Sequence, residues 1–284
     1  MTTTNTTSTT QAPAPAKEPS QLSIARSIWA RAVADKATVV GVLAFYGLAI
    51  GAGVGALWPP LRDVFADLSL PAAFDSLLGG VPLNTPAGWV NAEMMSIMAP
   101  GFLIAAAMIS AGAATAGEEQ GRTLGLVLST GASRTTFLAA KSAAVLTHVL
   151  IVALGMFLGL LAGNAIGGMG LSVTAMIEAT LWMIPIALMY AAIALTVGAL
   201  TGDKRLTISL TAGIAAVSFV LSVLLPMSQS LSGWAKINLW YPYSANVALI
   251  DGIDWGLAAL TIAIAAAVSA VGFIGFQHRS NLRG

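Results

Sequence analysis

The sequence predicts an all-α protein that spans a membrane. Of its 284 residues, 57% are hydrophobic and only 9% are charged, whereas an ordinary soluble domain carries about 25% charged residues. Six apolar runs are each long enough to cross a hydrocarbon core of about 30 Å as a helix. They cover about 37–57, 92–116, 142–162, 175–200, 206–225 and 256–276. We therefore expect a polytopic membrane protein with six transmembrane helices, forming one domain over 20–284.

The N-terminal region differs from the rest of the chain. Residues 1–19 are rich in Thr, Ala and Pro, and such a segment cannot bury enough apolar surface to order itself, which predicts a disordered tail. Between 20 and 36, the apolar residues fall near one helical face while Arg26 and Arg31 lie elsewhere. This pattern favours an N-terminal interfacial helix ahead of the first span. A plain juxtamembrane basic segment is the alternative.

Glycines recur at four-residue spacing in two of the apolar runs. The first set is Gly47, Gly51 and Gly55, and the second is Gly155, Gly159, Gly163 and Gly167. This spacing leaves a smooth strip along one side of a helix, where a second helix can approach closely. We expect these glycines to lie at helix–helix contacts.

The prolines after the first run predict where it ends. Trp58 is followed by Pro59 and Pro60, and proline removes a backbone donor and disrupts a helix interior. Apolar residues over 61–68 then recur at helical spacing, so a short surface helix is expected there, with a second near 74–78. A further pair of short helices is expected between the fifth and sixth runs, around the sequence Trp-Tyr-Pro-Tyr.

Basic residues are divided unevenly between the two sides that six spans define. The side that holds both termini carries Arg26, Arg31, Lys36, Arg122, Arg134, Lys141, Lys204, Arg205, Arg279 and Arg283. The opposite side carries Arg62 and Lys236. By the positive-inside rule both termini are expected to be cytoplasmic, in a multi-pass protein of the cell membrane.

The segment between the second and third runs, 117–141, is charged and is expected to lie in the cytoplasm. Glu118 and Arg122 have the i,i+4 spacing of a helical ion pair, which predicts a short amphipathic helix. Gly131 is placed to end that helix, and Ser133 to cap a second helix that runs through Lys141 into the third span. A plain solvated turn is the alternative.

The same segment resembles a loop of known membrane proteins. An acidic pair, then Gly-x-Thr-Leu and Leu-x-Ser-Thr-Gly-Ala-Ser-Arg, follows a span that contains Pro100-Gly101. This sequence, from Glu118 to Arg134, is similar to the coupling loop of the permease subunits of type-2 exporter-class ATP-binding-cassette (ABC) transporters. The chain departs from that pattern at Arg122, which stands between Gly121 and Thr123.

The resemblance implies a function for the loop and a set of partners. It implies that the loop contacts a cytoplasmic ABC ATPase subunit, which binds ATP and Mg. The residues implied in this contact are Glu118, Glu119, Gly121, Arg122, Thr123, Leu124 and Arg134. It also implies a second permease, identical or related, and export of a hydrophobic or amphipathic substrate.

A few polar or helix-bending residues within the runs are candidates for a substrate path or gate. A charged group at the centre of a span costs about 2.5–3.5 kcal/mol. Glu93 and Glu178 open the second and fourth spans, where a solvated helix end is the alternative. His148 lies within the third span and suits an interhelical hydrogen bond better than a proton relay. Pro100 and Pro185 permit kinks or hinges.

The sequence offers no catalytic or cofactor-binding pattern. There is no Cys, no phosphate-binding loop, no His pair with metal-ligand spacing and no nucleophile with an evident base. The net charge of +1 suggests no affinity for nucleic acid. We therefore expect a transport subunit without its own ATPase site, cofactor or metal. An ion-coupled secondary transporter and a non-transporting membrane scaffold are the alternative functions.

Overall fold

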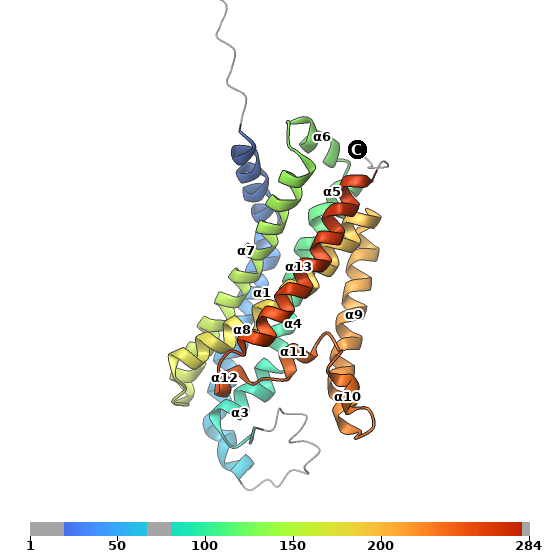
Figure 1. Ribbon diagram of the computed structural model, residues 1–284. Helices are drawn as coiled ribbons and strands as arrows, with labels where there is room; N and C mark the ends of the chain where they lie inside the picture. Colours follow the sequence, from blue (N-terminus) through green and yellow to red (C-terminus); the bar gives the residue numbers. More distant parts are fainter. Residues whose placement is uncertain (1–19, 67–80, 280–284) are drawn as a thin grey trace, which may run out of the picture.

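The computed structural model describes residues 20–66 and 81–279. Within these ranges every regular element is helical, and six helical stretches are long and apolar enough to cross a membrane. The predicted all-α fold with six spans is therefore confirmed (Figure 1). The predicted tail at 1–19 and the predicted helix near 74–78 lie outside the described residues.

The helices follow the order of the predicted spans. The first span is α1 (Gln21–Ala66). The second comprises α3 (Pro86–Val90), η1 (Asn91–Met95), α4 (Met98–Gly112), η2 (Ala113–Gly117) and α5 (Glu118–Gln120). After α6 (Leu124–Ser129), the next spans are α7 (Arg134–Gly167), α8 (Val173–Thr201) and α9 (Lys204–Leu224). Short helices η3 (Leu225–Met227), α10 (Ser232–Ala235), α11 (Tyr241–Ser244) and α12 (Ala248–Asp251) precede α13 (Trp255–His278).

The first helix is longer than the sequence predicts. It runs unbroken for 46 residues, so the predicted boundary between an interfacial helix and the first span is wrong. The expected end at Pro59 and Pro60 is also wrong, because both lie inside α1. No Gly or Pro occurs between 20 and 40 to break the helix. Contacts with α7 extend to Gly55, one turn before the prolines, and packing of this kind sustains a helix across proline.

The second span is irregular, as Pro100 predicts. The backbone leaves helical geometry at Ile97, where φ is −141°. Proline clashes with the carbonyl four residues earlier, which here belongs to Ser96, so the break falls where the proline requires it. Pro185, in contrast, lies within α8 without ending it.

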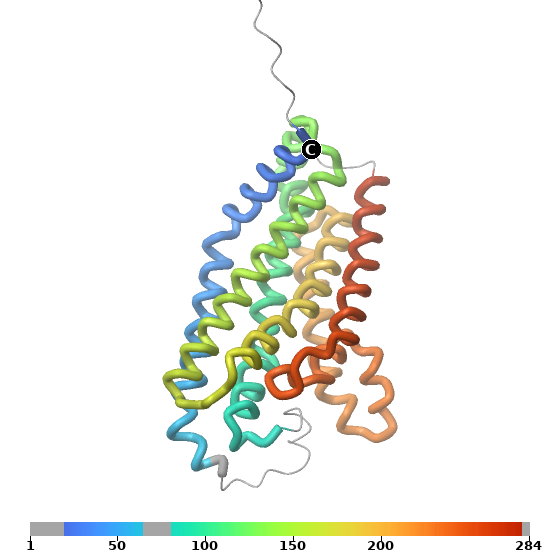
Figure 2. The backbone as a smooth tube through the Cα atoms, turned by 60° about the vertical axis from the view of Figure 1, so that its left-hand side comes forward, coloured from blue at the N-terminus to red at the C-terminus, as the bar shows by residue number. Residues whose placement is uncertain are grey.

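The glycine strips of the first and third spans lie at a helix–helix contact, as predicted, and the structure shows that the two strips meet one another. A Cβ atom added to Gly51 would lie less than 3.0 Å from the backbone of Gly159, and one added to Gly55 would meet Gly163 as closely. Figures 1 and 2 show α1 and α7 side by side along their length. We call this contact the glycine seam.

The helix α8 occupies the centre of the bundle, whereas α9 lies at its edge. The buried residues of α8 extend over its whole length, from Met176 to Ala199. Those of α9 form one narrow stripe, Thr207, Thr211, Ala215 and Ser218. The loop helices α5 and α6 share one end of the bundle with the start of α1 and the end of α13, and α3 and α10–α12 lie at the other (Figure 1).

Candidate functional site

The loop between the second and third spans folds differently from the single amphipathic helix predicted for its first half. It contains two short helices, α5 and α6, separated at Arg122, which has a φ of 56°. Thr123 N donates to Glu118 O and Arg122 N donates to Glu119 O. These are the bonds of a Schellman motif, which ends a helix with a left-handed residue. The helix therefore stops before the predicted Glu118–Arg122 pair can form on one face.

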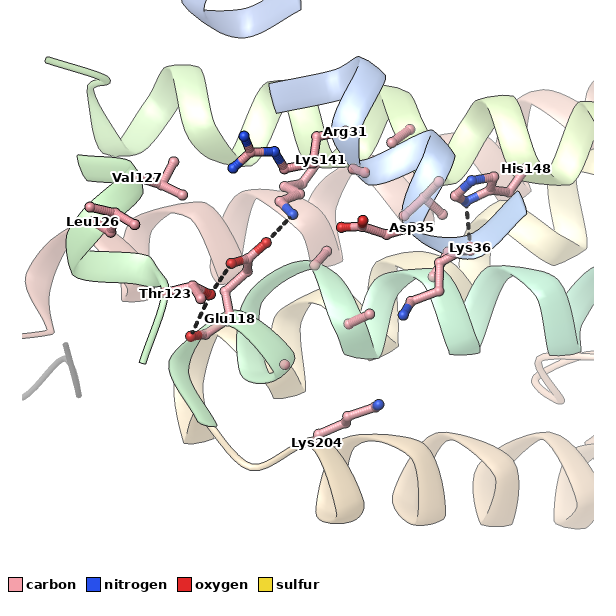
Figure 3. A pocket seen from close by; sticks show the side chains of 17 residues that line it. Arg31, Asp35, Lys36, Glu118, Thr123, Leu126, Val127, Lys141, His148 and Lys204 are labelled. Atoms are coloured by element: carbon pink, nitrogen blue, oxygen red, sulfur yellow. Dashed lines mark hydrogen bonds and ion pairs between the residues drawn. The ribbon is translucent and has the colours of Figure 1, made fainter. Parts of the chain in front are cut away.

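Glu118 turns inward and pairs with another helix. Its carboxylate accepts a hydrogen bond from Lys141 Nζ at 2.5 Å and another from the Thr123 hydroxyl. The side chains of Glu118 and Lys141 are 15% and 6% exposed. Figure 3 shows Glu118 between Thr123 and Lys141. This ion pair fixes α5 to α7.

Glu119 forms a second ion pair, with the end of the last helix. Its side chain is 1% exposed, and Arg279 donates to its two carboxylate oxygens at 2.7 and 2.9 Å. Arg279 also donates to Ala199 O at 2.8 Å. Bidentate pairing of this kind is strong and geometrically specific. It joins α5 to the ends of α8 and α13.

Arg134 is also directed into the protein. Its guanidinium donates to the backbone oxygens of Phe276, Gln277 and Arg279 at 2.9 to 3.0 Å. These carbonyls lie at the C-terminus of α13, where helix carbonyls lack intrahelical partners and the helix dipole favours a cation. Arg134 therefore attaches the start of α7 to the end of α13.

The second half of the loop matches its prediction. Leu124 is 1% exposed and packs in a small core with Phe137 and Phe276. Gly131 has a φ of 85° just beyond α6. Ser133 caps α7 by accepting a hydrogen bond from Thr136 N at 3.0 Å. The predicted stop and the predicted cap are both confirmed.

The residues implied in an ATPase contact thus fall into two groups. Glu118, Glu119, Leu124 and Arg134 bind other parts of this chain. Gly121, Arg122 and Thr123 are exposed. Leu126 on α6 is 68% exposed and extends this surface. We call the exposed residues Gly121, Arg122, Thr123 and Leu126 the loop tip.

The ion-pair roles of Lys141 and Arg279 were not predicted. Lys141 was placed in the helix that follows the loop and among the basic residues on one side of the membrane, and Arg279 only among those basic residues. Two carboxylates beside a long apolar run need nearby cations if they are buried. That requirement indicated that Glu118 and Glu119 would each have a cationic partner within the chain. The sequence alone did not indicate which cations, because Arg279 is 160 residues away from Glu119.

His148 holds three helices together. Its Nδ1 lies 2.7 Å from Ser110 Oγ on α4, and its Nε2 lies 3.3 Å from Val33 O on α1. In the neutral imidazole, a proton on Nε2 is donated to the Val33 carbonyl and Nδ1 accepts from the Ser110 hydroxyl. The predicted interhelical hydrogen bond is confirmed.

A cavity of about 330 Å³ lies beside the loop (Figure 3). Helices α1, α4, α7 and α9 and the loop itself contribute to its walls. Its charged lining residues are Arg31, Asp35, Lys36, Glu118, Lys141 and Lys204. We call it the cationic cavity.

The opposite end of the bundle has a cavity of another character. It measures about 430 Å³, and its aromatic lining residues are Trp182, Phe219, Trp240, Tyr241 and Tyr243. Tyr243 donates from its hydroxyl to Met95 O at 2.5 Å, and Trp182 Nε1 donates to Tyr243 O at 3.1 Å. These bonds attach α11, one of the short helices between α9 and α13, to η1 and α8. We call this hollow the aromatic cavity.

The candidate gate residues are not brought together. Glu93 is exposed in η1. Glu178 is half-buried near the start of α8, and its carboxylate lies beside Gly252. His148 is enclosed among α1, α4 and α7. Pro100 lies on α4, and Pro185 shares α8 with Glu178. Neither the cationic cavity nor the aromatic cavity brings the five residues together as one site.

Comparison with known proteins identifies a family. No curated protein and no solved structure matches the chain significantly. A family model described as "Multidrug efflux system permease Rv1217c, C-terminal domain" matches residues 37–277, which include all of the predicted spans. The resemblance to ABC-transporter permeases is thereby confirmed. The chain belongs to the family of the multidrug efflux system permease Rv1217c, C-terminal domain, and is a multi-pass membrane permease.

Proposed function

We propose that this chain is the membrane subunit of an ABC exporter that is driven by ATP hydrolysis in a separate cytoplasmic ATPase subunit. The ATPase would bind the ATP and Mg, and the loop tip would be its docking surface. Membership of a multidrug efflux permease family supports a transport role. A second permease, identical or related, would complete the assembly in the cell membrane, with both termini in the cytoplasm.

The observation that carries this proposal is the attachment of the loop. Two acids, Glu118 and Glu119, fix α5 to α7 and to the end of α13, while the loop tip stays exposed. A segment that is rigidly joined to two spans and exposed at its tip can transmit a displacement. Leu124 also packs α6 into a core with Phe137 of α7 and Phe276 of α13. A push on the loop would therefore move α7 and α13 rather than deform the loop.

The conformation of Arg122 supports a role for its side chain. A left-handed conformation costs a non-glycine residue about 1–2 kcal/mol. Glycine would fill this position of a Schellman motif without that cost. Strained residues are found where function requires them, so the retained Arg side chain is consistent with a contact outside this chain.

The aromatic cavity supports a hydrophobic or amphipathic cargo. Its volume of about 430 Å³ falls in the range of about 300–1,000 Å³ that is typical of small-molecule sites. Within the described residues its lining contains aromatic, aliphatic and uncharged polar side chains. Such a surface offers apolar area and stacking without selecting one charge.

Copurification with the ATPase tests the proposal. Replacing Leu126→Asp or Arg122→Gly should lower the amount of ATPase recovered with the permease by roughly tenfold, which corresponds to about 1.4 kcal/mol of binding. Arg122→Gly is the sharper variant because it also relieves backbone strain, so the permease itself should be as stable as the wild type or more so. Ile237→Asp, an exposed substitution at the other end of the bundle, is the matched control.

Two outcomes would contradict the proposal. If all variants recover the same amount of ATPase, the loop tip is not part of the interface with the ATPase. Transport that stops when the proton gradient is collapsed, while ATP remains high, would replace ATP coupling with an ion-coupled mechanism.

A further inference from the structure

We propose that the cationic cavity binds the phosphate group of an anionic ligand, either the headgroup of a membrane phospholipid or free phosphate. The cavity is formed where α1, α4, α7 and α9 meet the loop (Figure 3). The proposal concerns binding by this chain alone, so it does not depend on the ATPase.

The charges around the cavity are not balanced by the protein. Lys141 is neutralised by Glu118 at 2.5 Å. Among the residues that the structure describes, Arg31, Lys36 and Lys204 form no ion pair. The four cations of the lining, Arg31, Lys36, Lys141 and Lys204, thus face two carboxylates, Glu118 and Asp35, which leaves an excess of positive charge.

The arrangement of these cations suits a phosphate. They come from two separate helices, with Arg31 and Lys36 on α1 and Lys204 on α9. In Figure 3 the side chains of Lys36 and Lys204 extend toward one another from these helices. Like charges that converge on a partly enclosed space repel one another unless an anion lies between them. Arg and Lys both form strong, charge-assisted hydrogen bonds with phosphate oxygens.

The cavity has room for such a group. Its volume of about 330 Å³ compares with a share of about 30 Å³ for one water molecule in the liquid. A phosphate with a glycerol moiety therefore fits together with several waters. His148 and Ser110, at the inner end, already satisfy one another and leave the cations as the polar groups available to a ligand.

A lipid is the source that the surroundings favour. Basic pockets between transmembrane helices are typical sites for anionic headgroups. The same two helices carry exposed apolar residues within two turns of the lining cations, Val39 and Val42 on α1 and Leu206 and Leu210 on α9. Acyl chains could contact these residues. Free phosphate offers the same oxygens without chains, so the experiment separates the two sources.

The position of the cavity gives the ligand a consequence for the loop. Thr123, Leu126 and Val127 of the loop also line it. A bound anion would lie between these residues and α9, the helix with the fewest buried residues among the long spans. Occupancy would therefore attach α9 to the rest of the bundle through Lys204.

Calorimetric titration of the purified full chain in detergent tests the proposal. The probes are short-chain phosphatidylglycerol, short-chain phosphatidylcholine and inorganic phosphate. Phosphatidylglycerol should bind saturably, and the Lys36→Gln/Lys204→Gln double variant should bind it about 25-fold more weakly, at about fivefold per Lys. Lys36→Arg/Lys204→Arg should keep the affinity. Arg62→Gln, which removes an exposed cation at the other end of the bundle, should leave it unchanged.

Each outcome decides the proposal. Binding of inorganic phosphate as tight as that of phosphatidylglycerol, with the same loss in the double variant, supports the site with free phosphate as its ligand. The proposal is overturned if neither phosphatidylglycerol nor inorganic phosphate binds saturably. It is also overturned if phosphatidylcholine binds as tightly as phosphatidylglycerol, or if the double variant keeps the wild-type affinity. If the double variant does not fold, Lys204→Gln alone should show the fivefold loss.

Discussion

The glycine seam and the helix α9 are two opposite ways of attaching a span to the same bundle. In the seam, the backbones of α1 and α7 touch directly at Gly51 and Gly55, and no side chain separates them. In α9, only a narrow stripe of small polar and Ala side chains is fully buried, and the other described residues of the helix are half-buried or exposed. Two backbones in direct contact have no side chains between them that could change rotamer. A narrow contact made by small side chains allows one helix to slide along the other. The difference suggests that α1 and α7 move as one body and that α9 is free to shift against it.

The largest effect is expected from a side chain inserted into the seam. Gly55→Leu would place its side chain against the backbone of Gly163, which cannot yield as a flexible side chain could. Since even ordinary overpacking of a core costs about 1–3 kcal/mol, we expect this variant not to reach the folded state. Gly53→Leu, on the same helix with open space around its Cβ, is the control. Thermal unfolding in detergent should therefore show a cooperative transition for Gly53→Leu and none for Gly55→Leu. Equal melting temperatures of the two variants would disprove the rigid seam.

An intermediate effect is expected at the ion pair between Glu119 and Arg279, which fixes the loop to the ends of α8 and α13. Glu119→Ala leaves the Arg279 guanidinium, 18% exposed, without its carboxylate. Removing one partner of a buried pair costs about 3–5 kcal/mol. The exchanged pair Glu119→Arg/Arg279→Glu should recover part of that stability, as measured by denaturant unfolding. If the exchanged pair loses as much free energy of unfolding as Glu119→Arg and Arg279→Glu lose when summed, the pairing itself contributes nothing.

The smallest effect is expected in the stripe of α9. Ala215→Leu adds volume at a buried position, yet α9 can move outward to accept it because few of its other residues are buried. We expect a loss of about 1 kcal/mol, at the low end for overpacking. Ala216→Leu, at the neighbouring exposed position, controls for the change in side chain. If Ala215→Leu fails to fold, as expected for Gly55→Leu, then α9 is held as tightly as α1 and the two attachments do not differ.

Features that depend on neighbouring residues in the sequence were predicted well. The six spans follow from the length of the apolar runs. The left-handed Gly131 just beyond α6 and the cap at Ser133 follow from the local preferences of Gly and Ser. The break before Pro100 is equally local. The prediction that Pro59 and Pro60 end the first span failed because the contact with α7 sustains the helix, and that contact is not local.

The candidate site was predicted in position but not in its internal pairing. The sequence by itself determined that a charged loop joins the second and third spans, because charge and hydropathy are properties of the chain. Only the tertiary structure decided that Glu118 binds Lys141 and Glu119 binds Arg279, 23 and 160 residues away. The physical reason is that a buried charge pairs with whichever cation the packing of the helices brings to it, and the packing of six spans is a property of the whole bundle.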